Sequence, residues 1–220
     1  MLILNLKTYT ESTGGNVYNL VNAVKETLEV NSEYSKFIHV APSAMYLSEL
    51  KGTYPQLNLA AQTVDNKPAG STTGWMPAQN LADAGITLSI YNHSEHRQNQ
   101  ETIVEDIKAI QATGVNLVVC CENVEEAAKI LEANPFAIAY EPKDLIGSGI
   151  SVTTRPEACK EFISLVKGKT KVIIGAGVTT GEDVKNSLEM GADGVLLASA
   201  FVKATDPFAK LVELAMPFVK

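Results

Sequence analysis

Eight short apolar runs, separated by segments with helical periodicity, limit the possible folds of this chain more than any other feature. The runs cover residues 2–6, 37–41, 57–61, 86–91, 116–121, 136–140, 171–174 and 194–198. They are nearly continuous and do not alternate between apolar and polar residues, which is typical of parallel strands buried on both faces. The order of the runs predicts eight repeated strand–helix units.

The segments between the runs carry apolar residues three and four positions apart, as one buried face of a helix requires. Three such stripes are Val17, Leu20, Val21, Val24 and Leu28; Ile103, Val104, Ile107 and Ile110; and Phe208, Leu211 and Leu214. Pro156 and Gly168 stand where a further helix should begin and end. Thr179 with Glu182 predicts a capping box before the penultimate helix.

The length of the repeats favours a closed barrel. Eight units in 220 residues give about 27 residues each, which suits a (β/α)8 barrel. An open, doubly wound sheet is the alternative, but it needs hydrophilic edge strands, and none of the eight runs has that character. No linker or low-complexity stretch divides the chain. We therefore expect an α/β protein with a single barrel domain over residues 1–220.

Composition argues against several classes of function. The chain has 18 Lys and Arg against 25 Asp and Glu, a net charge of −7, whereas nucleic-acid binding needs clustered cations. No apolar run approaches the roughly 20 residues of a membrane span, and the opening run is too short for a secretory signal. Cys120, Cys121 and Cys159 fit neither a disulfide framework nor a zinc site. We expect a cytoplasmic protein, in a reducing compartment, without nucleic-acid or membrane partners.

Three chemically active side chains lie where such a barrel places its functional residues, after the carboxyl ends of strands. Lys7 offers a positive charge to an anion, although a solvated lysine fits this segment equally well. His93 precedes residues that can start a helix, and a helix N-terminus would keep its imidazole neutral. A lone histidine is nevertheless more often structural. Glu141 ends a buried run, where a carboxylate is costly unless it is paired or functional.

Glycine-rich loops follow the last three runs. The segment from Lys143 to Gly149 has polar ends and an apolar middle, a composition that suits a lid closing over a ligand; an ordinary surface loop is the alternative. Residues 175–181 and 198–199 are small, so their backbone amides can approach an anion closely. This pattern predicts a phosphorylated ligand without naming a reaction. Glycines needed only for tight turns are the alternative.

Several motifs occur together in one order along the chain. They are Asn5-x-Lys7, Asn92-His-Ser-Glu95, Ala139-Tyr-Glu-Pro142 with Ile146-Gly-Ser-Gly149, Gly175-Ala-Gly-Val-Thr-Thr-Gly-Glu-Asp183 and Gly191-Ala-Asp-Gly-Val-Leu-Leu-Ala-Ser199. In this order they resemble the triosephosphate isomerase family, particularly its short archaeal type, over nearly the whole chain. The resemblance implies a TIM barrel that interconverts dihydroxyacetone phosphate and D-glyceraldehyde 3-phosphate through an enediolate, without a cofactor or metal.

The resemblance also implies roles for individual residues. Glu141 would be the base that moves the proton, His93 the neutral electrophile, and Lys7 the cation that stabilises enediolate and phosphate charge. Asn5 would help to orient substrate, and Glu95 would form an ion pair with Lys7. Further substrate-binding residues would be Gly147, Ser148, Gly175, Ala176, Gly177, Val178, Ala198 and Ser199. Ser94 and Cys120 would lie behind the reacting residues, and burial in the core explains Cys120 equally well.

Three residues depart from the family pattern. His96 stands where an arginine is usual, which puts a peripheral ion pair in doubt, and Ala200 stands where glycine is common. Thr63 replaces a histidine frequent in the archaeal subgroup. It opens the segment from Thr63 to Pro77, which in the family projects into a neighbouring subunit. The resemblance therefore implies a homodimer or homotetramer, with an ordinary surface loop as the alternative.

Two other functions compete with the isomerase. Another phosphate-binding barrel enzyme, such as a lyase or synthase acting on a larger phosphoester, would explain the glycine-rich loops. It gives no reason for Lys7, His93 and Glu141 to occur together. A catalytically silent phosphosugar-binding barrel would tolerate loss of Glu141. The isomerase is the preferred hypothesis because it uses all three side chains.

Overall fold

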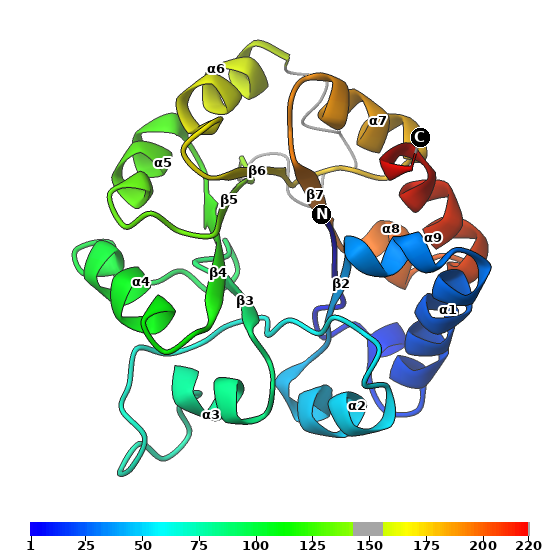
Figure 1. Cartoon of the computed structure of the whole chain (residues 1–220), viewed down its shortest axis with the longest axis horizontal. Helices are drawn as coiled ribbons and strands as arrows, with labels where there is room; N and C mark the ends of the chain where they lie inside the picture. The colour runs from blue at the N-terminus through cyan, green and yellow to red at the C-terminus, as the bar shows by residue number, and fades with distance from the viewer. Residues whose placement is uncertain (143–155, 220) are drawn as a thin grey trace.

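The structure, a computed structural model, describes residues 1–142 and 156–219, and its strands form one parallel sheet. The strands are β1 (Leu2–Asn5), β2 (Ile38–Ala41), β3 (Leu88–Tyr91), β4 (Asn116–Cys121), β5 (Ala137–Tyr140), β6 (Lys171–Ile174) and β7 (Gly194–Leu197). Their order in the sheet is β2-β1-β7-β6-β5-β4-β3. Figure 1 shows the strands as an inner ring with the helices around it.

The apolar run at 57–61 closes this ring between the two outermost strands of the sheet. Leu59 forms a parallel bridge with Val40 of β2, and Ala61 forms one with Ser89 of β3. The run thus takes the place of the eighth predicted strand, although it pairs only through single bridges. Because both edges of the sheet are joined through it, the prediction of a single-domain (β/α)8 TIM barrel is confirmed.

Helices cover the outside of the barrel. They are α1 (Asn16–Val30), α2 (Leu47–Thr53), α3 (Ala78–Asp83), α4 (Ile103–Gln111), α5 (Val124–Leu131), α6 (Pro156–Val166), α7 (Gly181–Glu189), α8 (Ser199–Val202) and α9 (Pro207–Ala215). The three predicted stripes lie on α1, α4 and α9 and pack toward the sheet, except Phe208 of α9, which is half-buried outside this core. None of the described helices combines the length and the apolar character that crossing a membrane requires.

Both faces of the sheet are buried, which explains why the runs do not alternate. On β1, Leu2 and Leu4 belong to the layer between sheet and helices, whereas Ile3 points into the barrel. On β4, Val118 and Cys120 likewise point into the barrel. Small and branched side chains fill this interior, so the barrel is a packed core and its strand ends form a fixed rim.

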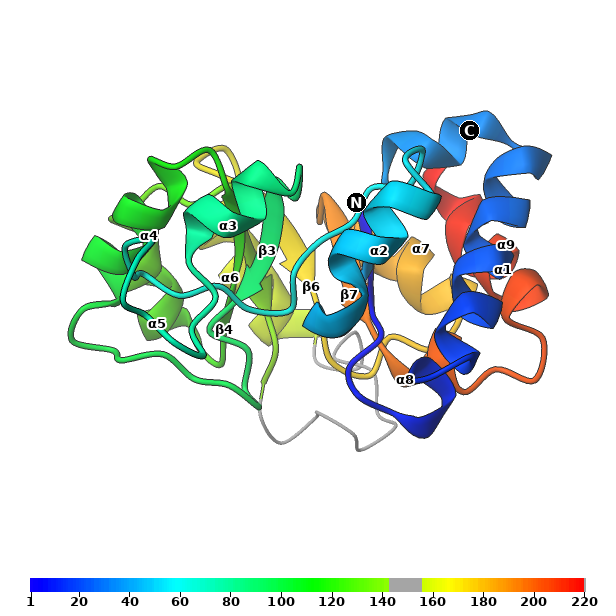
Figure 2. The same ribbon diagram turned by 90° about the horizontal axis from the view of Figure 1, so that it is seen from below.

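The described segments that follow the strands leave the same end of the barrel. In a parallel closed sheet every strand ends at one rim, and the following loops lie together there. Figure 2 shows α8, which directly follows β7, at the end of the barrel opposite the amino terminus. Segments that are far apart in the sequence are therefore neighbours at this rim.

The predicted capping box before α7 is wrong by one residue. Thr180 is the N-cap: its Oγ1 accepts a hydrogen bond from the Asp183 N–H at 3.1 Å, and its own N–H donates to Asp183 Oδ2 at 3.0 Å. Thr180 has the extended backbone that an N-cap needs. Glu182 instead lies 3.9 Å from the Nζ of Lys185 on the exposed side of the helix. Both Thr179 and Thr180 fit the sequence pattern of a cap, so the path of the chain after β6 selects between them.

The corrected cap predicts a stability difference between two neighbouring substitutions. Thr180→Ala removes the side chain that caps α7, so we expect it to lower the free energy of unfolding by about 1 kcal/mol. Glu182→Ala, the matched control, should change it by less than about 0.5 kcal/mol, because this side chain is exposed. Urea unfolding followed by circular dichroism measures both values. Equal losses in the two variants would contradict the assignment of the cap.

Candidate active site

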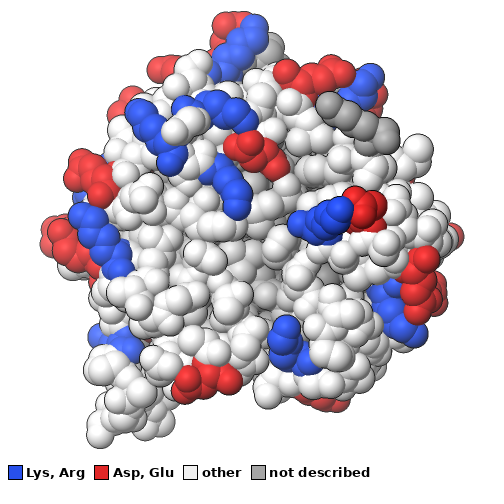
Figure 3. All heavy atoms as spheres, in the orientation of Figure 1, with Lys and Arg blue, Asp and Glu red and all other residues white. Residues whose placement is uncertain are grey.

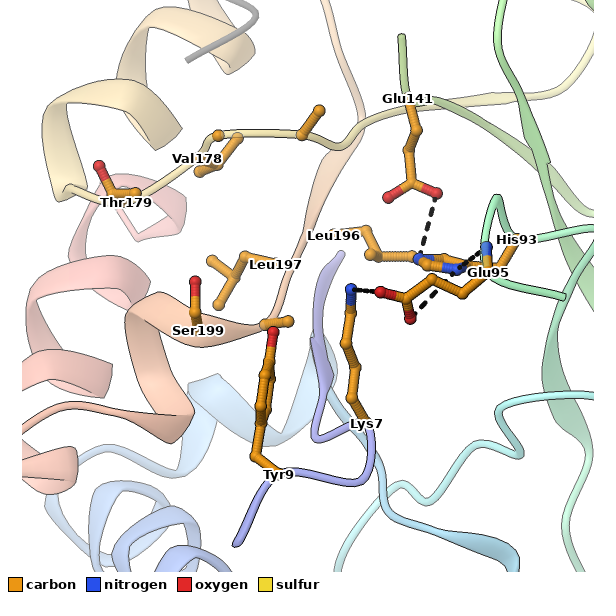
Figure 4. A pocket seen from close by; sticks show the side chains of 13 residues that line it. Lys7, Tyr9, His93, Glu95, Glu141, Val178, Thr179, Leu196, Leu197 and Ser199 are labelled. Atoms are coloured by element: carbon orange, nitrogen blue, oxygen red, sulfur yellow. Dashed lines mark hydrogen bonds and ion pairs between the residues drawn. The ribbon is translucent and has the colours of Figure 1, made fainter. Parts of the chain in front are cut away.

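A cavity of about 330 Å³ lies at the carboxyl ends of the strands. Its lining residues come from the end of β7 and from the segments that follow β1, β3, β5, β6 and β7, and they are Lys7, Tyr9, His93, Glu95, Glu141, Ala176, Gly177, Val178, Thr179, Leu196, Leu197, Ala198 and Ser199. Figure 4 shows Lys7, His93 and Glu141 converging on this cavity from three separate segments. The structure thus brings together the three side chains on which the sequence-based hypothesis depends.

His93, which lies just after β3, is only 6% exposed. Its Nδ1 accepts a hydrogen bond from the backbone N–H of Glu95 at 3.1 Å. A ring nitrogen that accepts an N–H carries no proton, so the neutral ring has its hydrogen on Nε2. Nε2 lies 3.7 Å from Oε2 of Glu141. The imidazole therefore presents an N–H donor on the side that faces the carboxylate.

The expected reason for a neutral imidazole at His93 is wrong. No helix begins there: the chain makes a turn, in which the His96 N–H donates to the His93 carbonyl at 2.8 Å, and α4 starts only at Ile103. The contact that the structure does show is the hydrogen bond from the Glu95 N–H to Nδ1, and it fixes the orientation of the ring.

Glu141 directly follows β5 and is only 4% exposed. Its backbone N–H donates to the Cys121 carbonyl at 2.9 Å, which continues the pairing between β5 and β4. Its Oε2 is buried and finds no hydrogen-bond partner among the described residues. An unpartnered buried oxygen is costly, and here it faces a cavity. This carboxylate is available to accept a proton from a bound molecule.

Gly175 provides the space for this carboxylate. A Cβ at position 175 would lie 2.6 Å from the Cγ of Glu141 and 2.8 Å from its Oε1. Gly175 was expected to bind substrate, but it lies behind Glu141 and does not line the cavity. Cys120 is a second buried neighbour. Burial, followed by the charge of Glu141, raises the pKa of the Cys120 thiol well above its usual value, so the thiol stays protonated.

Lys7 reaches the cavity from a strained backbone after β1. Its φ is 49°, which lies in the left-handed region that residues with a side chain rarely adopt. Two hydrogen bonds hold the backbone of Lys7 in this conformation. Asn5 Oδ1 accepts one from the Lys7 N–H at 3.0 Å, and Gln62 Nε2 donates the other to the Lys7 carbonyl at 3.0 Å. Lys7 Nζ lies 2.7 Å from Glu95 Oε1, so the expected ion pair is present. Asn5 is buried behind Lys7 and does not line the cavity.

Small residues after β6 and β7 form another wall of the cavity. Ala176 and Gly177 both have left-handed backbones, with φ of 65° and 71°. The N–H groups of Gly177 and Val178 donate to no other residue in the described part of the chain. Ser199 begins α8, so its N–H also lacks a partner within the helix. Free amides grouped in this way provide a binding site for an anion.

Comparison with known proteins decides the family. The family model described as triosephosphate isomerase matches residues 1–215. A triosephosphate isomerase of Cenarchaeum symbiosum is 38% identical over 218 residues, covering 98% of this chain and 96% of the relative. That of Methanobrevibacter smithii is also 38% identical, covering 97% and 96%, and that of Caldivirga maquilingensis is 37% identical, covering 100% and 97%. The chain belongs to the triosephosphate isomerase family.

Four residues that line the cavity were not predicted from the sequence, and some predicted residues lie outside the described part of the chain. Tyr9 and Thr179 line the cavity, as do Leu196 and Leu197. Tyr9 could have been found, because it follows Lys7 by two residues in the same loop, whereas strand-end leucines resemble any core residue. Gly147, Ser148 and the whole segment from Lys143 to Gly149 lie outside the described residues.

None of the three departures from the pattern of the triosephosphate isomerase family lines the cavity. His96 is exposed, and the adjacent Arg97 instead forms an ion pair with Glu126. Ala200 lies within α8, one residue beyond the cavity lining. Ser94 lies beside His93, and its Oγ is buried without a hydrogen-bond partner among the described residues. Thr63 opens the long segment after the run at 57–61.

The contact between Gly175 and Glu141 predicts that a single methyl group displaces the carboxylate. In Gly175→Ala the new Cβ needs roughly 3.5 Å from the carbons of Glu141, so we expect a crystal structure to show the carboxylate displaced by about 1 Å. Turnover of triose phosphate should fall at least about tenfold. Gly52→Ala is the control, because nothing lies within 4 Å of its Cβ position. An undisplaced Glu141 with normal turnover in Gly175→Ala would refute the role of this glycine.

Proposed function

We propose that this protein interconverts dihydroxyacetone phosphate and D-glyceraldehyde 3-phosphate by proton transfer through an enediolate. One observation carries the proposal: His93 Nε2 and Glu141 Oε2 lie 3.7 Å apart, both side chains buried at one cavity. A carboxylate and an N–H donor this close can contact adjoining atoms of the same small molecule. Those atoms are a carbonyl oxygen and the hydrogen on the neighbouring carbon.

Each step of this isomerisation has a residue suited to it. Glu141 removes a proton from the carbon beside the carbonyl and returns it to the other carbon. The Nε2–H of His93 donates to the carbonyl oxygen on which negative charge develops and passes its proton to it, and Nε2 takes up the proton of the hydroxyl group on the neighbouring carbon, so that the carbonyl and hydroxyl groups exchange places. The ammonium group of Lys7 adds electrostatic stabilisation. The reaction transfers hydrogen within one molecule, so substrate and product have the same oxidation level overall. The chain's own side chains are sufficient for the proton transfers.

The phosphate group of the substrate would bind to the wall of small residues. The free N–H groups of Gly177 and Val178, together with that of Ser199 at the start of α8, support this placement. Phosphate sites in barrels of this kind commonly use the loops after the last two strands and a short extra helix. Binding a group that does not react can help to stabilise the transition state. Gly147 and Ser148 remain sequence-based predictions for the same phosphate.

The competing functions explain less of the site. A lyase or synthase acting on a larger phosphoester gives no reason for His93 Nε2 to lie 3.7 Å from Glu141 Oε2. A silent phosphosugar binder would gain nothing from a buried carboxylate oxygen at Glu141 that has no hydrogen-bond partner among the described residues. The isomerase accounts for both observations, since it needs an N–H donor beside its base and the base must be free to accept a proton.

Removing the charge of Glu141 tests the proposed base. In Glu141→Gln we expect kcat to fall by about 10³-fold, since an amide cannot take the proton. Binding of a phosphoglycolate-like anion should remain largely intact. A coupled assay measures kcat, and titration calorimetry measures anion binding. Glu122→Gln is the matched control, because Glu122 follows the neighbouring strand β4 without lining the cavity. Near-normal kcat in Glu141→Gln rules out the assignment.

We also propose that the protein is a homodimer or homotetramer that associates through residues 63–77. Figure 1 shows this segment projecting outward beside α3, and Figure 3 shows the projection as mostly uncharged. Its base is fixed, because the Asp65 N–H donates to the Met76 carbonyl at 2.8 Å. Trp75 is 52% exposed, with Lys67 Nζ 4.6 Å from the centre of its ring. A supported projection that exposes a tryptophan is suited to contact another subunit.

A charge on this projection tests self-association. Trp75→Glu should shift the protein to a smaller oligomer, because a carboxylate buried at an apolar contact is costly. Analytical ultracentrifugation measures the mass in solution. Val30→Glu serves as the control, since Val30 is 64% exposed at the end of α1, away from the projection. An unchanged oligomer in Trp75→Glu would show that this segment is an ordinary surface loop.

A cytoplasmic location remains a proposal. It is supported by Cys120 and Cys121, which are buried and form no disulfide in the described part of the chain. Free thiols persist most readily in a reducing compartment. That residues 1–220 act as one domain is likewise a proposal, supported by the barrel in which the described strands join.

A further inference from the structure

We propose that Asn92, held by Glu126 and Arg97, is a positioning residue that fixes His93 opposite Glu141. Asn92 is not part of the cavity lining and touches no proposed substrate atom. It directly precedes His93 in the chain, and its own contacts join the end of β3 to the end of β4. The effect on turnover rests on the proposed function, whereas the effect on the His93 ring does not.

The backbone of Asn92 sets the direction in which the chain leaves β3. Its φ is 58°, a left-handed conformation that asparagine adopts more readily than most residues with a side chain. The chain turns here, so that the next residue, His93, faces the cavity. A strained backbone persists only where its surroundings hold it in place. At Asn92 the hydrogen bonds of its own side chain hold the backbone in this conformation.

The amide group of Asn92 uses its full hydrogen-bonding capacity while only 1% exposed. Its Nδ2 donates to the Cys120 carbonyl at 2.9 Å and to Glu126 Oε1 at 3.0 Å. Its Oδ1 accepts from the Gln98 N–H and from Gln100 Nε2, each at 3.0 Å. Four satisfied hydrogen bonds at a buried site fix the amide in one orientation.

Glu126 and Arg97 form an ion pair that contacts Asn92 and fixes its amide. Glu126 Oε2 accepts the Glu122 N–H at 2.9 Å, which orients the carboxylate at the start of α5. Arg97 forms an ion pair with Glu126 Oε1, and its NH1 donates to the Asn92 carbonyl at 3.3 Å. The Glu126 side chain is only 10% exposed, so this pair is shielded from water more than a surface ion pair would be. The ion pair thus holds both the side-chain amide and the backbone carbonyl of Asn92.

These contacts connect the two reacting residues. Asn92 binds the carbonyl of Cys120, and the buried Cys120 thiol is the neighbour of Glu141 described above. A movement at position 92 therefore changes the placement of His93 relative to Glu141. Their facing atoms, Nε2 and Oε2, are 3.7 Å apart, and Figure 4 joins them by a dashed line. Displacing a reacting group by about 1 Å can cost up to about a hundredfold in rate.

Asn92→Gly is the informative variant, because glycine keeps the left-handed backbone accessible and removes only the amide. We expect kcat to fall about tenfold to a hundredfold while KM stays within about twofold. Nitrogen NMR of histidine-labelled protein gives a second readout. The wild type should show His93 with its proton on Nε2, and the variant should show a mixture of the two tautomers. The chain has only three histidines, which makes the assignment direct.

Asn58→Ala is the matched control. The Asn58 amide donates to the backbone carbonyls of Ser35 and Ile38, at 2.6 and 3.0 Å, near the start of β2 and far from the cavity. It should lose stability without changing kcat or the His93 spectrum. If Asn92→Gly also loses only stability, with kcat within twofold and the His93 tautomer unchanged, the proposal is overturned. Asn92 would then be a structural residue like Asn58.

A second variant covers the case in which Asn92→Gly does not fold. Glu126→Gln leaves the amide in place but removes the charge that orients it and that pairs with Arg97. It should show the same pattern, a lower kcat with little change in KM and a mixed His93 tautomer, and an unaltered kcat and spectrum would overturn the proposal. Should the wild-type protein fail to turn over triose phosphates, the proposed function falls. The His93 spectra would still decide whether Asn92 positions the ring.

Discussion

Closure of the parallel sheet is the constraint on which the rest of the structure depends. Because every strand runs in the same direction, all carboxyl ends meet at one rim. Lys7, His93 and Glu141 are far apart in the sequence, yet each follows a strand and thus comes to that rim. The apolar run at 57–61 is essential here, since it joins β2 to β3 and completes the ring. An open sheet would not bring these loops around one cavity.

The loops that meet at this rim contain residues with strained backbone conformations. Among the described residues, four that are not glycine have positive φ, and three of them, Lys7, Asn92 and Ala176, lie at or beside the cavity. Each such residue costs of order 1–2 kcal/mol. Hydrogen bonds from neighbouring side chains hold the first two in place, such as that from Gln62 to Lys7. The barrel core provides the rigidity that lets the rim keep these conformations.

The sequence alone predicted much of the site, for reasons that particular residues illustrate. Glu141 was identifiable because a carboxylate at the end of an apolar run needs a physical reason to be there. The cap of α7 was misplaced because Thr179 and Thr180 fit the pattern equally well, and only the chain path separates them. A helix was expected to begin after His93 and is not present. The hydrogen bond that the Glu95 N–H donates to His93 instead could not be predicted, because a backbone donor does not depend on residue type.

Periodicity and residue type by themselves predicted the eight strand–helix units, the barrel and the polar residues at strand ends. They could do so because a parallel strand that is buried on both faces needs a nearly continuous run of apolar residues. Tertiary structure alone decided which groups touch. Gly175 leaves space for the side chain of Glu141, and Glu126 accepts a hydrogen bond from the amide of Asn92. Both contacts form where segments that are distant in the sequence meet. Sequence spacing carries no information about such contacts, because they depend on distances across the barrel rim and not along the chain.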